Sequence, residues 1–186
     1  DFGYAEKSEK YVSIALKINP NLPQIYNIKG TLSEMKNDLK DAVKHYLKAI
    51  SLNQSYHEPI FNLSLIYLFS NQFKKGWEFY EKRWHNEAYL NKKMNTDRPY
   101  WSPGVSKNHK VTIWPEQGIG DFILMSRFLN DLKNATNHIT LLINDKLKPI
   151  YARSFPDIEF VTELDKSTID YHAPIGDLAK FYVNSF

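Results

Sequence analysis

The sequence of 186 residues predicts an α + α/β protein, in which helical hairpins are followed by a partial parallel βαβ sheet. Two observations support this prediction. The first half of the chain resembles itself at a shift of 34 residues, and the second half alternates short apolar strands with helices. We therefore expect helical repeats over residues 1–86, a linker over residues 87–107 and the sheet domain over residues 108–186.

Matching residues recur in the first half at a fixed spacing of 34. The matched pairs are Ala15 with Ala49, Leu16 with Ile50, Asn19 with Asn53, and Tyr46 with Tyr80. Small residues such as Gly30 and Ala42 allow two helices to approach closely, while aromatic side chains such as Tyr26 and Tyr46 fill the gaps. Residues 39–52 carry apolar side chains at helical spacing, which predicts an amphipathic helix.

The spacing of these residues resembles the tetratricopeptide repeat, a helical hairpin that stacks on its neighbours. It occurs twice, in the series Tyr26, Gly30, Ala42, Tyr46, Ala49 and in the series Leu63, Tyr67, Gly76, Tyr80. The resemblance implies that residues 4–18 are the second helix of one repeat, residues 23–52 a full repeat and residues 58–86 a more divergent repeat. The chain is therefore expected to be a fragment of a longer array.

Tetratricopeptide arrays bind a protein or peptide in a groove lined by the first helix of each hairpin. The resemblance therefore implies a protein or peptide partner. The groove-facing side chains that it implies are Gln24, Asn27, Thr31, Glu34, Phe61, Leu65 and Leu68. In the alternative interpretation, the repeats only present or brace the next domain.

The second half of the chain predicts shorter, alternating elements. Pro99, Pro103 and Gly104 first interrupt the helical pattern. Strands are then expected at residues 111–114, 138–143, 158–161 and 170–174, and helices at residues 121–133 and 146–154. Strands that alternate with helices of these lengths imply βαβ units, which form parallel sheets with right-handed crossovers.

The turn after the first predicted strand carries the sharpest motif of the chain. Gly118 and Gly120 form a Gly-x-Gly turn between a strand and a helix, where main-chain N–H groups can approach an anionic ligand. A Walker phosphate loop is excluded because no Gly-Lys-Ser or Gly-Lys-Thr follows. A dinucleotide fingerprint would use Asp145 as its ribose acid, but Ile123 occupies its third glycine position. Asp121 either caps the helix or acts as a catalytic carboxylate.

A second resemblance supports the catalytic interpretation. Three strings together resemble bacterial tetratricopeptide proteins fused to a heptosyltransferase-like domain of the family-nine glycosyltransferase type. These strings are residues 76–84, 98–104 and 116–121. The resemblance implies that the sheet belongs to the acceptor-side, amino-terminal half of two Rossmann-like halves, with Asp121 as the candidate base. The loop residues that it implies are Glu116, Gln117, Gly118 and Gly120. A nucleotide sugar would be the donor substrate and a sugar the acceptor, and no cofactor is expected in this chain.

Residues 170–174 also resemble this family, but Gly176, Asp177 and Leu178 follow where the family usually has Ser-Leu-Pro. This departure leaves an acceptor contact at that point unsupported. Proteins of this type bind the donor nucleotide mainly on the carboxyl-terminal half, so this chain alone is expected to be inactive as a transferase. The alternative function is a non-catalytic scaffold that binds a peptide or protein.

Composition and charge exclude several other classes. The chain has no cysteine, which excludes a disulfide scaffold and thiolate chemistry, and its six histidines are not spaced as metal ligands. The net charge is +3, but acidic and basic residues are interleaved, so nucleic acid is not an expected partner. No apolar run approaches the ~20 residues of a membrane span, and the first residues do not resemble a targeting signal. We expect a cytoplasmic protein without a metal site.

Two further groups, one of tryptophans and arginines and one of mainly aromatic residues, lead to structural predictions. One group is expected to pack the joint between the two domains; it consists of Trp77, Arg83, Trp84, Arg98 and Trp101. The other is the aromatic stretch at residues 181–186, which is expected to be exposed and to favour self-association.

Overall fold

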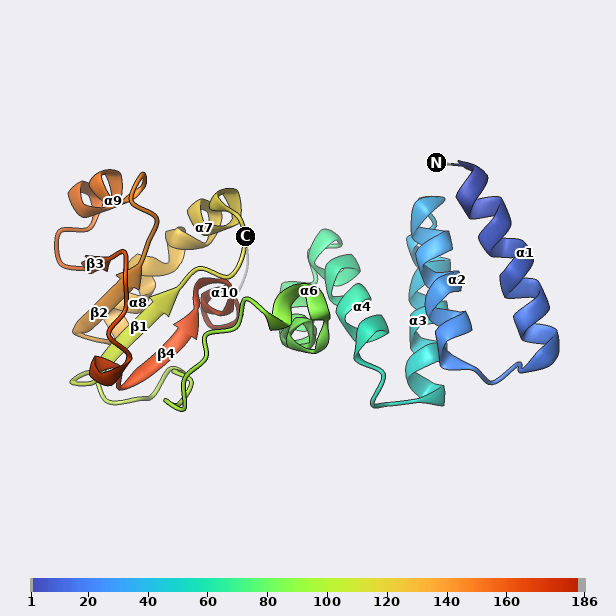
Figure 1. Cartoon of the computed structure of the whole chain (residues 1–186), viewed down its shortest axis with the longest axis horizontal. Helices are drawn as coiled ribbons and strands as arrows, with labels where there is room; N and C mark the ends of the chain where they lie inside the picture. Colours follow the sequence, from blue (N-terminus) through green and yellow to red (C-terminus); the bar gives the residue numbers. More distant parts are fainter. Residues whose placement is uncertain (1, 184–186) are drawn as a thin grey trace. The chain divides into compact units, whose positions relative to one another are not determined.

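The computed structural model describes residues 2–183, and side chains from residue 6 onward. The chain divides into two compact units, Asp1–Leu90 and Asn91–Phe186 (Figure 1). Helices form the first unit, and a parallel sheet with helices forms the second. The expected α + α/β class is therefore confirmed. The division falls inside the segment expected as a linker, so residues 87–90 belong to the helical unit and residues 91–107 to the sheet unit.

The helical unit consists of consecutive helices joined by short turns. They are α1 (Phe2–Ile18), α2 (Pro23–Met35), α3 (Leu39–Leu52), α4 (His57–Phe69), α5 (Phe73–Tyr80), the 3₁₀ helix η1 (Glu81–His85) and α6 (Glu87–Leu90). α2 packs beside α3, and α4 packs beside α5, so each short turn closes a helical hairpin (Figure 1). These bounds agree with the helices that the 34-residue pattern predicts.

The two hairpin turns have the same conformation. Asn37 and Asn71 have the only positive φ angles of non-glycine residues in the described part of the chain, at 60° and 59°. The residue after each asparagine donates its N–H to a carbonyl in the last turn of the preceding helix, Asp38 to Ser33 and Gln72 to Tyr67. This is the Schellman ending, in which asparagine can replace glycine. The two asparagines are 34 residues apart, so the sequence repeat is also a repeat of backbone structure.

Close helix contact inside the first hairpin depends on Gly30. The ring of Tyr46 is completely buried and lies directly against the Gly30 backbone. A Cβ atom at residue 30 would lie 2.6 Å from Cδ1 and 2.7 Å from Cζ of that ring. Ala42 and Ala49 are also completely buried, as the packing of small residues against aromatic ones predicts.

The sheet unit contains four parallel strands and short helices. The elements are β1 (Lys110–Trp114), α7 (Ile119–Met125), η2 (Ser126–Phe128), α8 (Leu129–Ala135), β2 (His138–Leu142), α9 (Lys148–Ser154), β3 (Glu159–Val161), η3 (Lys166–Thr168), β4 (Tyr171–Pro174), η4 (Ile175–Asp177) and α10 (Leu178–Tyr182). The strand order is β3-β2-β1-β4, and every neighbouring pair is parallel. All four predicted strands and the parallel arrangement are confirmed.

The helix expected at residues 121–133 differs from the structure. It begins two residues earlier, at Ile119, and is divided by the 3₁₀ turn η2. Ser126 lies at this interruption, where its Oγ donates to the Ile123 carbonyl at 2.7 Å and lies 2.8 Å from the Tyr151 hydroxyl. A serine that bonds back to the main chain competes with the helical hydrogen bonds, which explains the tighter turn.

The segment before β1 extends the sheet at its β4 edge. Trp101 donates its N–H to the His172 carbonyl at 2.8 Å, and His172 donates its N–H to the Pro99 carbonyl at 3.1 Å. Tyr100 pairs with His172 as a parallel bridge. Trp101 is 3% exposed, and its indole packs against Phe181. The indole that was expected at a domain joint therefore contacts its own unit.

Arg83 is buried by aromatic contacts of the helical unit. Its guanidinium lies 4.6 Å from the Tyr80 ring centroid and 4.3 Å from the Trp84 ring centroid, and Nη1 donates to the Tyr80 carbonyl. The aromatic end of the chain is also partly buried within its unit. Phe181 packs against Trp101, and Tyr182 stacks on Phe128. These two side chains therefore do not form the exposed patch that the sequence suggested; residues 184–186 lie outside the described residues.

None of the helices in the described part of the chain combines the length and the hydrophobicity needed to cross a bilayer.

Candidate functional site

The strand order makes the carboxyl ends of β1 and β4 the candidate ligand site. In the strand order, β2 and then β3 lie beside one edge of β1, whereas β4 pairs with the other edge of β1. In open parallel sheets, ligands bind outside the carboxyl ends of the strands where the order reverses in this way. Trp114 and Pro174, the last residues of β1 and β4, are paired, and α7 contacts η4 just beyond them. The motif selected from the sequence therefore lies at the expected position in the sheet.

The loop between β1 and α7, at residues 115–118, places its side chains at different depths. Glu116 is 3% exposed, Gln117 is half-buried and Gly118 is exposed. Gly120, which was expected in the loop, is also exposed but is the second residue of α7. Gly118 is the N-cap residue of α7, with extended backbone. The Asp121 carboxylate is directed back toward it, since a Cβ atom on Gly118 would lie 3.5 Å from Asp121 Oδ2.

Asp121 does not cap the helix. It is the third residue of α7, whose N-cap is Gly118, and it is exposed. Its carboxylate makes no hydrogen bond with any residue that the structure describes. The capping alternative, in which Asp121 accepts from the N–H groups of Ile123 or Leu124, is therefore wrong. An exposed carboxylate beside two glycines is instead accessible to a ligand.

A buried Trp–His pair supports this end of the sheet. Trp114 Nε1 donates to His172 Nδ1 at 3.0 Å, and the two side chains are 2% and 1% exposed. An indole can only donate, so Nδ1 of His172 must be unprotonated and the neutral ring carries its proton on Nε2. The sequence offers no signal for this pair, because the partners are 58 residues apart and meet only through the β1–β4 pairing.

Protonation of His172 is expected to destabilise the sheet unit. Burial lowers the pKa of His172 below 6.5, with Lys93 acting in the same direction, while the Arg98 main chain and Asp177 oppose it. The unfolded chain therefore binds a proton that the folded chain does not, and stability falls as pH decreases below about 6.5. We expect a histidine C–H resonance that titrates below its ordinary range and is lost in His172→Gln. A titration of His172 near or above its ordinary pKa would contradict this prediction.

The structure places the predicted groove residues at three levels of exposure. Gln24, Thr31 and Leu65 are exposed, Glu34 and Leu68 are half-buried, and Asn27 and Phe61 are buried, at 5% and 7% exposure. The expectation that all seven face a groove is wrong for Asn27, whereas Phe61, although buried, lines a pocket of the helical unit. Asn27 is buried because its amide connects α2 with α4 by hydrogen bonds, and Phe61 because its ring packs between Tyr80 and Tyr89.

Asn27 belongs to a chain of hydrogen bonds that ends at the Glu58 carboxylate. Asn62 Nδ2 donates to Asn27 Oδ1 at 3.2 Å, and Asn27 Nδ2 donates to the Tyr56 hydroxyl at 3.2 Å. Tyr56 in turn donates to Glu58 Oε2 at 2.9 Å. Burial and the neighbouring Glu58 raise the pKa of Tyr56 to about 12, so the hydroxyl remains a donor at neutral pH. The network therefore holds the Glu58 carboxylate in one orientation.

The exposed side chains on one side of α2 and α4, together with the half-buried Asn62, form what we call the groove face. It consists of Gln24, Ile28, Thr31 and Met35 on α2 and of Glu58, Asn62, Leu65 and Phe69 on α4. Each residue of the first set is 34 positions from one of the second, and residues spaced by 4, 7 and 11 lie on one side of a helix. Met35 is 58% exposed, Leu65 45% and Phe69 77%. Sequence reasoning missed Ile28, Met35 and Phe69, although their helical spacing from Gln24 and Leu65 could have identified them.

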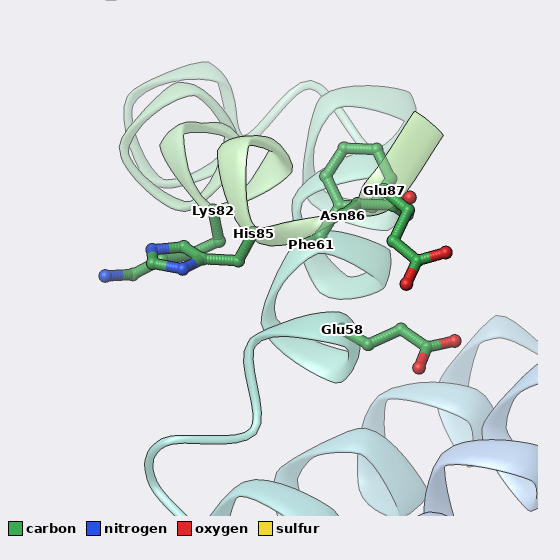
Figure 2. Close-up of a pocket in the computed structure, with 6 residues that line it drawn as sticks. All are labelled: Glu58, Phe61, Lys82, His85, Asn86 and Glu87. Atoms are coloured by element: carbon green, nitrogen blue, oxygen red, sulfur yellow. The ribbon is translucent and has the colours of Figure 1, made fainter. Parts of the chain in front are cut away.

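A pocket lies at the amino-terminal end of α4 in the helical unit (Figure 2). Its volume is about 350 Å³, and its lining residues are Glu58, Phe61, Lys82, His85, Asn86 and Glu87. Figure 2 shows the carboxylates of Glu58 and Glu87 directed to the same side, and Lys82 directed away from both. Glu58 belongs both to this pocket and to the groove face.

Comparisons with known proteins give limited information about function. No model of a known protein family matches the chain. Among curated proteins, the chain is 26% identical over 113 residues to Protein FlbA of Caulobacter vibrioides. The matched segment comprises 59% of this chain and 18% of FlbA. This similarity does not assign a family, so the functional conclusions rest on the residues and their geometry.

Proposed function

We propose that the chain joins a tetratricopeptide protein-binding module to the acceptor-side half of a glycosyltransferase of the heptosyltransferase type. The observation that carries the enzymatic part is the exposed Asp121 carboxylate, which lies beside Gly118 at the carboxyl end of β1. The Schellman turns at Asn37 and Asn71, 34 residues apart, support the tetratricopeptide part. The strand order 3-2-1-4 supports a Rossmann-like half, because that order begins the doubly wound sheet.

In the proposed reaction, a hydroxyl of the acceptor sugar attacks the anomeric carbon of a nucleotide sugar. The bond from that carbon to the nucleoside diphosphate breaks, and the diphosphate leaves with the bonding electrons. Asp121 accepts the hydroxyl proton, for which its carboxylate must come within ~3 Å of the acceptor oxygen. Gly118 and Gly120 have no side chains that could hinder this approach. A second Rossmann-like half would bind most of the donor.

The natural full-length protein with Asp121→Asn is expected to lose transfer activity by about 100-fold or more, since a positioned general base contributes about 10²–10⁴-fold. Asparagine keeps the size of the side chain but cannot take up the proton. Activity would be measured as nucleoside diphosphate released from a panel of nucleotide sugars. Asp145→Asn is the matched control, because Asp145 is also an exposed carboxylate soon after a strand and is the ribose acid of the dinucleotide alternative. Equal activity of the wild type and Asp121→Asn would refute the base assignment.

A non-catalytic binding scaffold is the second candidate function. The groove face favours it, because Met35 and Phe69 expose large apolar side chains on one side of their helices. Exposed apolar surface of this kind often marks a site of protein contact. The two candidates differ in their response to Asp121→Asn, since a scaffold retains every measurable property in that variant.

A further inference from the structure

The pocket at the start of α4 is lined by two carboxylates, those of Glu58 and Glu87. Within the described part of the chain, neither Glu58 nor Glu87 forms an ion pair. Lys82 lines the same pocket, but its ammonium group is directed away from them (Figure 2). The His85 ring lies against that of His57, with 3.8 Å between the ring centroids and the planes tilted by 31°. Burial and the neighbouring His85 and Lys82 lower the pKa of His57, so the His57 ring adds little positive charge at neutral pH.

The carboxylate of Glu58 is held in place before any ligand binds. Tyr56 donates to its Oε2, and Asn27 donates in turn to Tyr56. Its other oxygen has no partner among the residues that the structure describes. A fixed acceptor of this kind binds a cation with little loss of side-chain freedom.

The pocket has the size and the lining for a cationic side chain. Phe61 lines the same pocket as the two carboxylate residues, and its ring is fixed by contacts with Tyr80 and Tyr89. An aromatic wall beside paired carboxylates suits guanidinium or ammonium groups, which combine charge-assisted hydrogen bonds with contacts to a ring.

The apolar part of the groove face lies farther along the side of α4 that carries Glu58. Leu65 and Phe69 follow Glu58 by 7 and 11 residues, so they lie on the same side of α4, about 10 and 16 Å along its axis. A bound segment that extends along α4 from this pocket by about 10 to 16 Å therefore reaches two exposed apolar side chains.

We propose that the groove face binds a protein segment whose arginine or lysine side chain occupies the pocket between Glu58 and Glu87. Apolar side chains of the same segment contact Leu65 and Phe69. The charge complementarity selects a basic side chain, and the apolar side chains farther along α4 favour a peptide segment over a free cation. This inference rests on the protein-binding part of the proposed function.

Fluorescent peptides that carry one arginine and two leucines at varied spacings test the inference. A matched set replaces arginine with citrulline, which has nearly the same shape but no charge, and another set replaces it with glutamate. Dissociation constants would be measured by fluorescence anisotropy with the full chain. The best arginine peptide is expected to bind at least about tenfold more tightly than its citrulline counterpart.

Three variants separate the contribution of charge from that of apolar contact, and a fourth is the control. Glu58→Gln keeps an acceptor for Tyr56 and should remove most of the preference for arginine over citrulline. Glu87→Lys should shift the preference toward the glutamate peptide. Leu65→Ser should weaken the binding of the arginine peptide and of the citrulline peptide by the same factor. Glu163→Gln, an exposed substitution in the sheet unit, is the control and should change nothing.

Each contrary result has a distinct meaning. Equal affinity for arginine and citrulline peptides would overturn the basic anchor and leave protein binding intact. A preference for arginine that persists in both Glu58→Gln and Glu87→Lys would overturn the assignment to this pocket. Absence of binding by every peptide would overturn the inference together with the protein-binding part of the proposed function.

Discussion

Replacing Trp114 with alanine is expected to destabilise the sheet unit by about 3–5 kcal/mol, the usual cost of removing a buried large aromatic side chain. Trp114 is 2% exposed at the end of β1, next to the candidate loop. The change leaves a cavity and removes the donor to His172 Nδ1. Both effects favour unfolding, and they act on the residues that position the β1–α7 loop.

Urea denaturation of the full chain would measure this loss, with the unfolding of the sheet unit followed by amide hydrogen exchange of β1 and β2. Trp114→Phe is the informative control, because it retains most of the ring volume but lacks the N–H group. We expect it to cost less than Trp114→Ala and to raise the pKa of His172. If Trp114→Ala cost no more than a typical surface substitution, about 0.5 kcal/mol or less, the packing described for this pair would be incorrect.

Gly30→Ala is expected to destabilise the helical unit by about 1–3 kcal/mol, although alanine is favoured over glycine by about 1 kcal/mol within a helix. The new methyl group would lie 2.6 Å from Cδ1 of Tyr46, and that ring is completely buried and cannot move aside freely. For a unit of this size, the loss corresponds to a decrease in Tm of about 5 °C or more. Circular dichroism of the full chain would follow the helical transition.

Two further variants isolate the steric cause. Gly120→Ala places its methyl group where no atom lies within 4 Å, so it should not lower the stability of the sheet unit. Tyr46→Leu removes the ring, and adding Gly30→Ala to it should cost much less than in the wild type. Additive effects of Gly30→Ala and Tyr46→Leu would show that the contact between these residues does not control stability.

The candidate sites could be predicted only in part. The Gly-x-Gly turn and Asp121 stand out in the sequence, because a strand, a glycine turn and a helix follow one another within a short stretch. The pocket of the helical unit could not be predicted in this way. Glu58 and Glu87 are 29 residues apart and line one pocket only because η1 packs beside α4 and Tyr89 of α6 contacts Phe61 of α4. The residues between them show no ligand-binding pattern.

The predicted groove shows a related limit. The resemblance to the tetratricopeptide repeat placed Leu65 on the groove-facing side of α4, and Leu65 is exposed. Burial of Asn27 and Phe61 depends on partners from other helices, namely Tyr56 for the amide and Tyr80 for the ring. The period of one helix contains no information about such partners.

Local patterns in the sequence by themselves determined the helical hairpins, the four strands and the position of the Gly-x-Gly turn. These features follow from short-range periodicity and from glycine and asparagine at turns, which act within a few residues. Tertiary structure alone decided the Trp114–His172 pair, the free Asp121 carboxylate and the acidic pocket at Glu58. Each of these arises from long-range packing or from where a helix starts, because the energy of a side chain depends on neighbours that only the folded chain brings together.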